Sequence, residues 1–180
     1  MVGDSLSAEY GLKRGSGWVA LLEKKLAAEK MPARLVNASI SGDTTSGGRS
    51  RLGILLARHK PTHVVIELGG NDALRGLALG MTQDNLSHMV RAAQQAGAKV
   101  LLVGIQLPPN YGSDYGNRFA GLFEKVAQQH KAAVVPFLLK GVADGPEASK
   151  LFQADRLHPN EEAQAAMLGN VWPELKKLLK

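Results

Sequence analysis

The chain has 180 residues, no cysteine, and 22 Lys and Arg against 16 Asp and Glu, which gives a formal net charge of +6. This length suits one domain over residues 1–180, and the lack of cysteine excludes a disulfide scaffold, a Cys-type zinc site and a thiol nucleophile. No apolar run approaches the roughly 18 residues of a membrane span, and the basic balance is compatible with nucleic acid, anionic lipid or a phosphate-bearing substrate without choosing among them.

The first third of the chain predicts a helix, a short strand and a second helix. Apolar residues recur at helical spacing from Trp18, and Ser16 precedes them in the position of an N-cap. Residues 35–38 have the pattern of a short strand. A second helical stripe around Leu52 ends at Pro61, because proline does not continue a helix.

The middle of the chain predicts two buried strands around a well-marked helix. Residues 63–68 are rich in β-branched side chains and are bounded by glycine. Thr82 is the expected cap of the next helix and Gly97 its stop. Residues 99–103 form the second apolar run and predict another buried strand.

The last third repeats the alternation. A helical stripe begins at Phe119, residues 133–135 predict a last strand, and Pro159 suits the first position of a C-terminal helix. Strands separated by single helices indicate parallel pairing with right-handed crossovers. We therefore expect a three-layer α/β/α sandwich with a mainly parallel five-stranded sheet, in which ligands bind beyond the carboxyl ends of the strands.

The loops after the expected strands carry the residues of a serine hydrolase. Acyl transfer by serine requires a nucleophile, a base and a group that orients the base. Ser5 is the candidate nucleophile and His158 the candidate base, with Asp155 three residues earlier to orient the imidazole. The G-x-S-x-G elbow of the α/β-hydrolases is absent.

Oxyanion donors are also available in these loops. The backbone N–H groups of Ser5 and Gly42, with the side-chain amide of Asn71, are the candidate donors. Each motif alone has a simpler explanation as a turn or a helix cap, and their joint occurrence at successive strand ends favours the catalytic interpretation. On spacing alone, Asp4 and Asp72 are alternative triad acids; we prefer Asp155 because its distance in sequence to His158 enforces proximity.

Other candidate sites are weaker. His59, His63, His88 and His130 lie before a strand or on helical patterns, where packing or surface roles are expected, and no tight ligand cluster predicts a metal site. Residues 15–20 fit a dinucleotide-binding pattern but do not follow a strand. The basic clusters are scattered over helices without interleaved aromatic residues, so we do not expect nucleic-acid binding.

The chain resembles the SGNH hydrolases, also called GDSL esterases, over essentially its whole length. The resemblance rests on the ordered blocks around Ser5, Gly42 and Asn71, on the Pro-Pro-Asn-Tyr-Gly loop at 108–112, and on residues 155–160. It is strongest to the bacterial periplasmic group of thioesterase, arylesterase and lysophospholipase enzymes. The family likeness implies a flavodoxin-like fold, no metal and no organic cofactor.

The same resemblance implies roles for individual residues. Ser5, Asp155 and His158 correspond to the triad, and Ser5, Gly42 and Asn71 to the oxyanion hole. Substrate contacts are expected from Asp4, Leu6, Asp72, Leu107, Pro108, Pro109 and Tyr111. The expected substrates are short- to medium-chain acyl esters and thioesters, including lysophospholipids, handled by a periplasmic or secreted monomer or weak homo-oligomer without nucleic-acid partners.

Three rival interpretations remain open at the level of sequence: a carbohydrate acetyl esterase on the same scaffold, a non-catalytic flavodoxin-like binding module, and a nucleic-acid binder. One departure from the family pattern also stands out. Only Met1 and Val2 precede Gly3, whereas similar enzymes carry a full apolar strand there. Two explanations are open: either the protein begins upstream of Met1, or the sheet is built around a very short first strand.

Overall fold

A computed structural model describes residues 1–180 and contains one parallel sheet. The sheet has four strands in the order β1-β2-β3-β4, each paired in parallel with its neighbour. The strands are β1 (Val2–Gly3), β2 (His63–Glu67), β3 (Lys99–Val103) and β4 (Ala133–Val135). The expected parallel α/β architecture is confirmed, and β1 has the short length that the sequence indicates.

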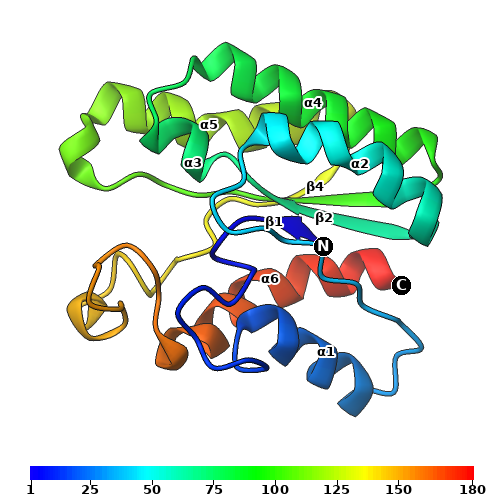
Figure 1. Cartoon of the computed structure of the whole chain (residues 1–180), viewed down its shortest axis with the longest axis horizontal. Coiled ribbons are helices and arrows are strands. Elements are labelled where there is room, and N and C mark those ends of the chain that lie inside the picture. The colour runs from blue at the N-terminus through cyan, green and yellow to red at the C-terminus, as the bar shows by residue number, and fades with distance from the viewer.

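Six α-helices and three 3₁₀ turns complete the fold. They are α1 (Trp18–Ala28), α2 (Thr45–His59), α3 (Gly70–Leu74), α4 (Leu79–Gln95), η1 (Pro109–Tyr111), α5 (Ser113–His130), η2 (Ala148–Lys150), η3 (Glu161–Ala163) and α6 (Gln164–Leu179). Figure 1 shows α2, α4 and α5 above the sheet and α1 and α6 below it. The three layers are those of the predicted sandwich. None of these helices combines the length and apolar character that crossing a membrane requires.

The sheet has four strands rather than the expected five, because residues 35–38 do not form a regular strand. This segment nevertheless runs beside β1, where the Ala38 N–H donates to Met1 O at 2.9 Å and the Ile40 N–H donates to Gly3 O at 3.0 Å. Two residues of β1 offer too short a ladder to hold a full partner strand. The segment therefore covers the free edge of β1 with only a few hydrogen bonds.

The predicted apolar stripes form the core on both faces of the sheet. Fully or nearly fully buried members are Trp18, Leu22, Leu26, Leu52, Leu86, Met89, Val90, Phe119, Phe123, Met167, Val171 and Leu175. Strands β2 and β3 are buried over most of their length, as their continuous apolar runs predict.

Three predicted helix starts are wrong, and the structure shows what each residue does instead. The N-cap of α1 is Gly17 rather than Ser16, whose hydroxyl instead donates to Lys13 O. Thr82 lies inside α4, where its buried hydroxyl donates to the Asp72 carboxylate at 3.3 Å. Pro159 precedes the C-terminal helix, which follows an Asn160-capped 3₁₀ turn.

The contact of α2 with its neighbours depends on Gly48. A Cβ atom at this position would lie 2.3 Å from Leu68 Cδ1 and 3.1 Å from Met89 Sδ, both in fully buried side chains. At Gly53, in the same helix, a Cβ atom would meet nothing within 4 Å.

We therefore expect Gly48→Ala to be less stable than Gly53→Ala by about 1–3 kcal/mol, the usual cost of overpacking a core. Replacing glycine by alanine in a helix gains about 1 kcal/mol of helix propensity in both variants. The difference between their free energies of unfolding therefore reports packing alone. Urea unfolding at equilibrium measures it. Equal stability of the two variants would show that the contact between α2 and its neighbours is loose.

Candidate active site

The nucleophile candidate lies on a tight turn directly after β1. The Ser7 and Ala8 N–H groups donate to Asp4 O at 3.2 and 2.9 Å, and the Leu6 N–H donates to Asp4 Oδ1 at 3.0 Å. Asp4 therefore closes the turn with both its backbone and its side chain. These bonds hold the half-buried Ser5 at the carboxyl edge of the sheet.

A second turn, at residues 155–158, holds the acid and the base. The Asp155 Oδ1 atom accepts the N–H groups of Leu157 and His158, each at 3.0 Å, while Oδ2 lies 2.6 Å from His158 Nδ1. Arg156 adopts the left-handed conformation with φ of 55° between them. The backbone thus brings the Asp155 carboxylate against one nitrogen of the imidazole.

The other imidazole nitrogen faces the nucleophile. His158 Nε2 lies 2.9 Å from Ser5 Oγ, across a sequence separation of 153 residues. A hydrogen on Nδ1, donated to Asp155, leaves Nε2 as the acceptor of the Ser5 O–H. The Tyr10 ring also packs on the imidazole, with centroids 4.4 Å apart and planes inclined by 39°. This arrangement can remove a proton from Ser5.

The Asp155 carboxylate is held in its ionised form. Hydrogen bonds from the Leu157 N–H, the His158 side chain and the His158 N–H lower the pKa of Asp155 to about 2. The carboxylate is therefore negatively charged at neutral pH, and it favours the Nδ1-protonated imidazole.

Free donors surround the space beside Ser5. Neither the Ser5 N–H nor the Gly42 N–H donates to an acceptor within the protein. Gly42 adopts a positive φ of 78°, and its carbonyl accepts from Arg75 Nη2 at 2.8 Å. The guanidinium of Arg75 thereby fixes the peptide plane next to the free N–H.

The side-chain amide of Asn71 joins the same cluster. Its Nδ2 atom donates to Asp43 O at 2.9 Å and to Asp4 Oδ2 at 3.1 Å. These partners are the sequence neighbours of Gly42 and Ser5, so the Asn71 amide lies beside both free N–H groups. Because both of its hydrogens already have protein acceptors, an oxyanion here must share one of them.

Asp4 and Asp72 do not reach the surface of this site. Asp4 is 3% exposed and Asp72 is 2% exposed. The Asp72 carboxylate accepts the Thr45 N–H at 2.9 Å and the Thr45 hydroxyl, and so it anchors the start of α2. The expectation that these two carboxylates contact substrate is not supported by their positions, and Asp155 is the carboxylate that contacts His158.

The remaining predicted residues border the same edge of the sheet. Leu6 is half-buried in the nucleophile turn. The residues 107–111 follow β3, whose carboxyl end faces the same way as that of β1, and Pro108, Pro109 and Tyr111 are exposed. Leu107 is half-buried at the base of this loop. That they contact a ligand at Ser5 stays a prediction.

Sequence reasoning missed two residues of the site, Tyr10 and Arg75. Tyr10 contacts His158 and Arg75 contacts Gly42, and both contacts join segments far apart in the chain. No spacing in the sequence indicates either of them.

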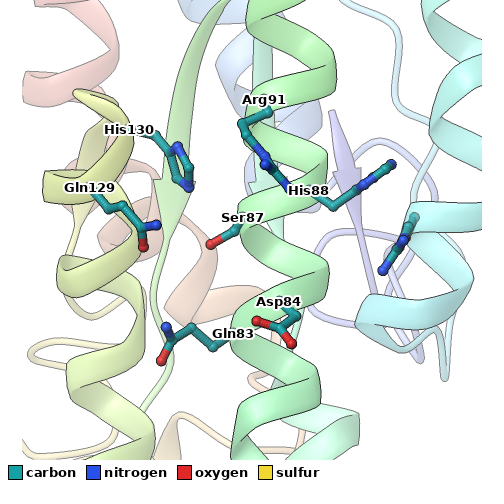
Figure 2. Close-up of a pocket in the computed structure, with 8 residues that line it drawn as sticks. Gln83, Asp84, Ser87, His88, Arg91, Gln129 and His130 are labelled. Atoms are coloured by element: carbon teal, nitrogen blue, oxygen red, sulfur yellow. The ribbon is translucent and has the colours of Figure 1, made fainter.

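A polar cavity of about 210 Å³ lies apart from these residues, on α4 and its neighbours α2 and α5. Figure 2 shows Ser87, Gln83 and Gln129 on the side of α5, and His88 on the opposite side of α4. The cavity shares no lining residue with the Ser5 site. Nowhere in residues 1–180 do three or more His, Asp or Glu side chains form a group that could hold a metal ion.

Comparisons with known proteins identify the family of this chain. The sequence profile of the GDSL-like Lipase/Acylhydrolase family matches residues 1–166. The esterase TesA of Pseudomonas aeruginosa is 55% identical over 179 residues, which cover 99% of this chain and 88% of that protein. The thioesterase 1/protease 1/lysophospholipase L1 of Escherichia coli K12 is 40% identical over 164 residues, covering 91% of this chain and 76% of that protein.

A solved structure is similar over the same length. The psychrotrophic esterase EstA from Pseudoalteromonas sp., in a crystal structure inhibited by monoethylphosphonate, is 42% identical with a TM-score of 0.92. The match covers 99% of this chain and 96% of that one.

We expect the Asp155 carboxyl to titrate near pH 2 in a carbon-detected NMR titration. Its largest stabilising partner is the Leu157 N–H, so His158→Ala should raise this midpoint only part of the way toward 3.8. A full return of Asp155 to 3.8 would contradict the role of the backbone turn.

Proposed function

Because the chain belongs to the GDSL-like lipase/acylhydrolase family, we propose that Ser5 is the nucleophile of a serine esterase and thioesterase, with His158 as its base and Asp155 as the acid that orients it. The observation that carries this proposal is the continuous contact from Asp155 Oδ2 through both imidazole nitrogens to Ser5 Oγ, at 2.6 and 2.9 Å.

The reaction follows from this contact. His158 Nε2 takes the Ser5 proton as Ser5 Oγ attacks the carbonyl carbon of the ester or thioester. The imidazolium that forms lies between the Asp155 carboxylate and the Tyr10 ring, and both favour the positive charge. His158 then gives the proton to the departing alcohol or thiol, and a water molecule releases the acyl group by the same route.

The oxyanion is held by the Ser5 and Gly42 N–H groups with the Asn71 amide. The two backbone donors support this role because they have no acceptor within the protein. Their positions are set by the nucleophile turn and by Arg75, so they need no rearrangement when charge develops on the substrate oxygen.

The substrates are carboxylic esters and acyl thioesters. The relatives named above are an esterase, a thioesterase and lysophospholipase, and a second esterase. For this chain we propose short- to medium-chain acyl groups lying along Leu6, Leu107 and the exposed loop 108–111. Apolar side chains on an open edge suit such chains and place few limits on the leaving group.

The relatives come from bacteria, and we propose a periplasmic location for this chain on the strength of the family resemblance. The formal net charge of +6 is compatible with an anionic lipid or a phosphate-bearing leaving group as part of the substrate. Cell fractionation of the native host, with activity measured in each fraction, tests the location.

Replacement of the nucleophile is the central test. Ser5→Ala should lower kcat for a medium-chain aryl ester by at least about 10⁴-fold and abolish labelling by a phosphonate ester, which peptide mapping should locate on Ser5 in the unaltered protein. Ser16→Ala, in an exposed loop, is the control and should keep both properties. Activity retained by Ser5→Ala would end this proposal and favour a non-catalytic binding module or a different nucleophile.

The substrate class is tested by a panel. We expect kcat/KM for medium-chain aryl esters and acyl thioesters to exceed that for acetylated xylan by at least about tenfold, since the apolar loops contact an acyl chain and not a sugar. The reverse order would identify a carbohydrate acetyl esterase on the same scaffold. Ser5→Ala serves as the blank for every substrate.

A further inference from the structure

A pair of buried carboxyl groups lies directly beneath the nucleophile turn. Glu67 ends β2 and is fully buried, and Asp4 is almost so. Glu67 Oε2 accepts the Ser7 hydroxyl at 2.8 Å and the Asp4 N–H at 3.4 Å. A Cβ atom on Gly3 would lie 2.9 Å from the same oxygen, so the glycine allows this close approach.

No lysine or arginine side chain balances two negative charges at this pair. The charged groups that act on Asp4 are Glu67 and Asp43, both acidic, and His158. Asp4 is the one charged group that acts on Glu67. Glu67 Oε1 is buried and receives no hydrogen bond from any N–H or O–H donor of the protein. A buried carboxyl oxygen without a donor is most stable when the group carries a proton of its own.

The ionisation behaviour agrees with this geometry. Burial, and then the nearby Asp4 charge, raise the pKa of Glu67 well above its ordinary value. Burial raises the pKa of Asp4 only to about 6, because the Leu6 N–H, His158 and a hydrogen bond with Glu67 oppose it. When the pair holds a single proton, that proton is therefore on Glu67 and Asp4 carries the charge.

We propose that protonated Glu67 is a positioning residue for the hydrolysis, because it keeps Asp4 as the anionic acceptor that holds both the nucleophile turn and the Asn71 amide. The connections are direct: Asp4 Oδ1 binds the Leu6 N–H at 3.0 Å, and Oδ2 binds Asn71 Nδ2 at 3.1 Å. Glu67 itself touches neither Ser5 nor the substrate. This proposal rests on the proposed function of Ser5.

Loss of the proton from Glu67 has a definite effect on the site. It places a second negative charge against Asp4, with no lysine or arginine beside the pair, so the two carboxylates repel each other. Asp4 then shifts the Leu6 N–H and the Asn71 amide together, and the oxyanion donors lose alignment. The rate of hydrolysis consequently falls as the pH rises through the pKa of Glu67.

Two substitutions of Glu67 separate this role from packing. Glu67→Gln keeps an acceptor for the Ser7 hydroxyl and an N–H donor for Asp4, but it does not ionise. Glu67→Leu keeps much of the volume and offers neither. At pH 7 we expect Glu67→Gln to keep kcat within about threefold of the unaltered protein, and Glu67→Leu to lose about 10- to 100-fold in kcat with little change in KM.

The pH profile of kcat between pH 5 and 10 is the decisive measurement. The unaltered protein should lose activity reversibly at the alkaline end, and Glu67→Gln should lack this decline. An identical decline in both proteins overturns the proposal, as does full kcat in Glu67→Leu. If Glu67→Leu does not fold, as judged by circular dichroism, the Glu67→Gln profile decides alone.

Stability gives a second readout that does not depend on activity. The stabilisation by Glu67 is fully present below its unfolded pKa of 4.5 and is lost as the pH rises through its raised folded pKa. The urea midpoint of the unaltered protein should therefore fall relative to that of Glu67→Gln between pH 5 and pH 9. A difference between the two urea midpoints that stays constant with pH would contradict the proposal that Glu67 carries a proton in the folded protein. Ser5→Ala, measured in parallel, separates the proposed function from the proposal for Glu67. Activity retained by Ser5→Ala ends the proposed function. If Ser5→Ala is inactive and Glu67→Gln shows the same alkaline decline in kcat as the unaltered protein, only the proposal for Glu67 is overturned.

Discussion

The pairing of β1 with the end of β2 is the constraint on which the active site depends. Val2 pairs with Ile66 and Gly3 with Glu67, so the turn that carries Ser5 begins at the same height as the turn that carries Asn71. Parallel strands make this possible, because both carboxyl ends then open on one edge. Asp4 connects the two turns through its bond to Asn71. A shift of one residue in this register would separate Ser5 from the Asn71 amide.

The parts of the molecule that the sequence predicts well are those with local or periodic signals. The apolar run of β3 and the helical stripe at Phe119 and Phe123 need only their own pattern to be recognised, and both are buried as expected. The contact of Asp155 with His158 is similarly predictable, because a single turn brings the two side chains together. In these cases the sequence neighbourhood contains the whole physical cause.

Contacts between distant segments account for the rest. Thr82 is a residue type that often caps helices, yet its hydroxyl donates a hydrogen bond to the Asp72 carboxylate from inside α4. Asp4 and Asp72 stand beside catalytic motifs in the sequence, but the packing of other segments buries them. The strand expected at residues 35–38 depends on how many residues β1 offers as a partner. Arg75 and Tyr10 reach Gly42 and His158 only after the sheet and the loops are assembled.

The unequal spans of the two triad contacts have a consequence for folding. Asp155 and His158 are separated by three residues, whereas Ser5 and His158 are separated by 153. The contact of Asp155 with His158 therefore forms at little entropic cost, as soon as one turn closes, but Ser5 reaches His158 only when the two ends of the chain have docked. In a partly folded intermediate, Asp155 would already orient the imidazole of His158, but Ser5 would not yet lie beside it. The rate at which activity returns during refolding should therefore report the docking of the Ser5 turn against residues 155–158, and not the formation of secondary structure.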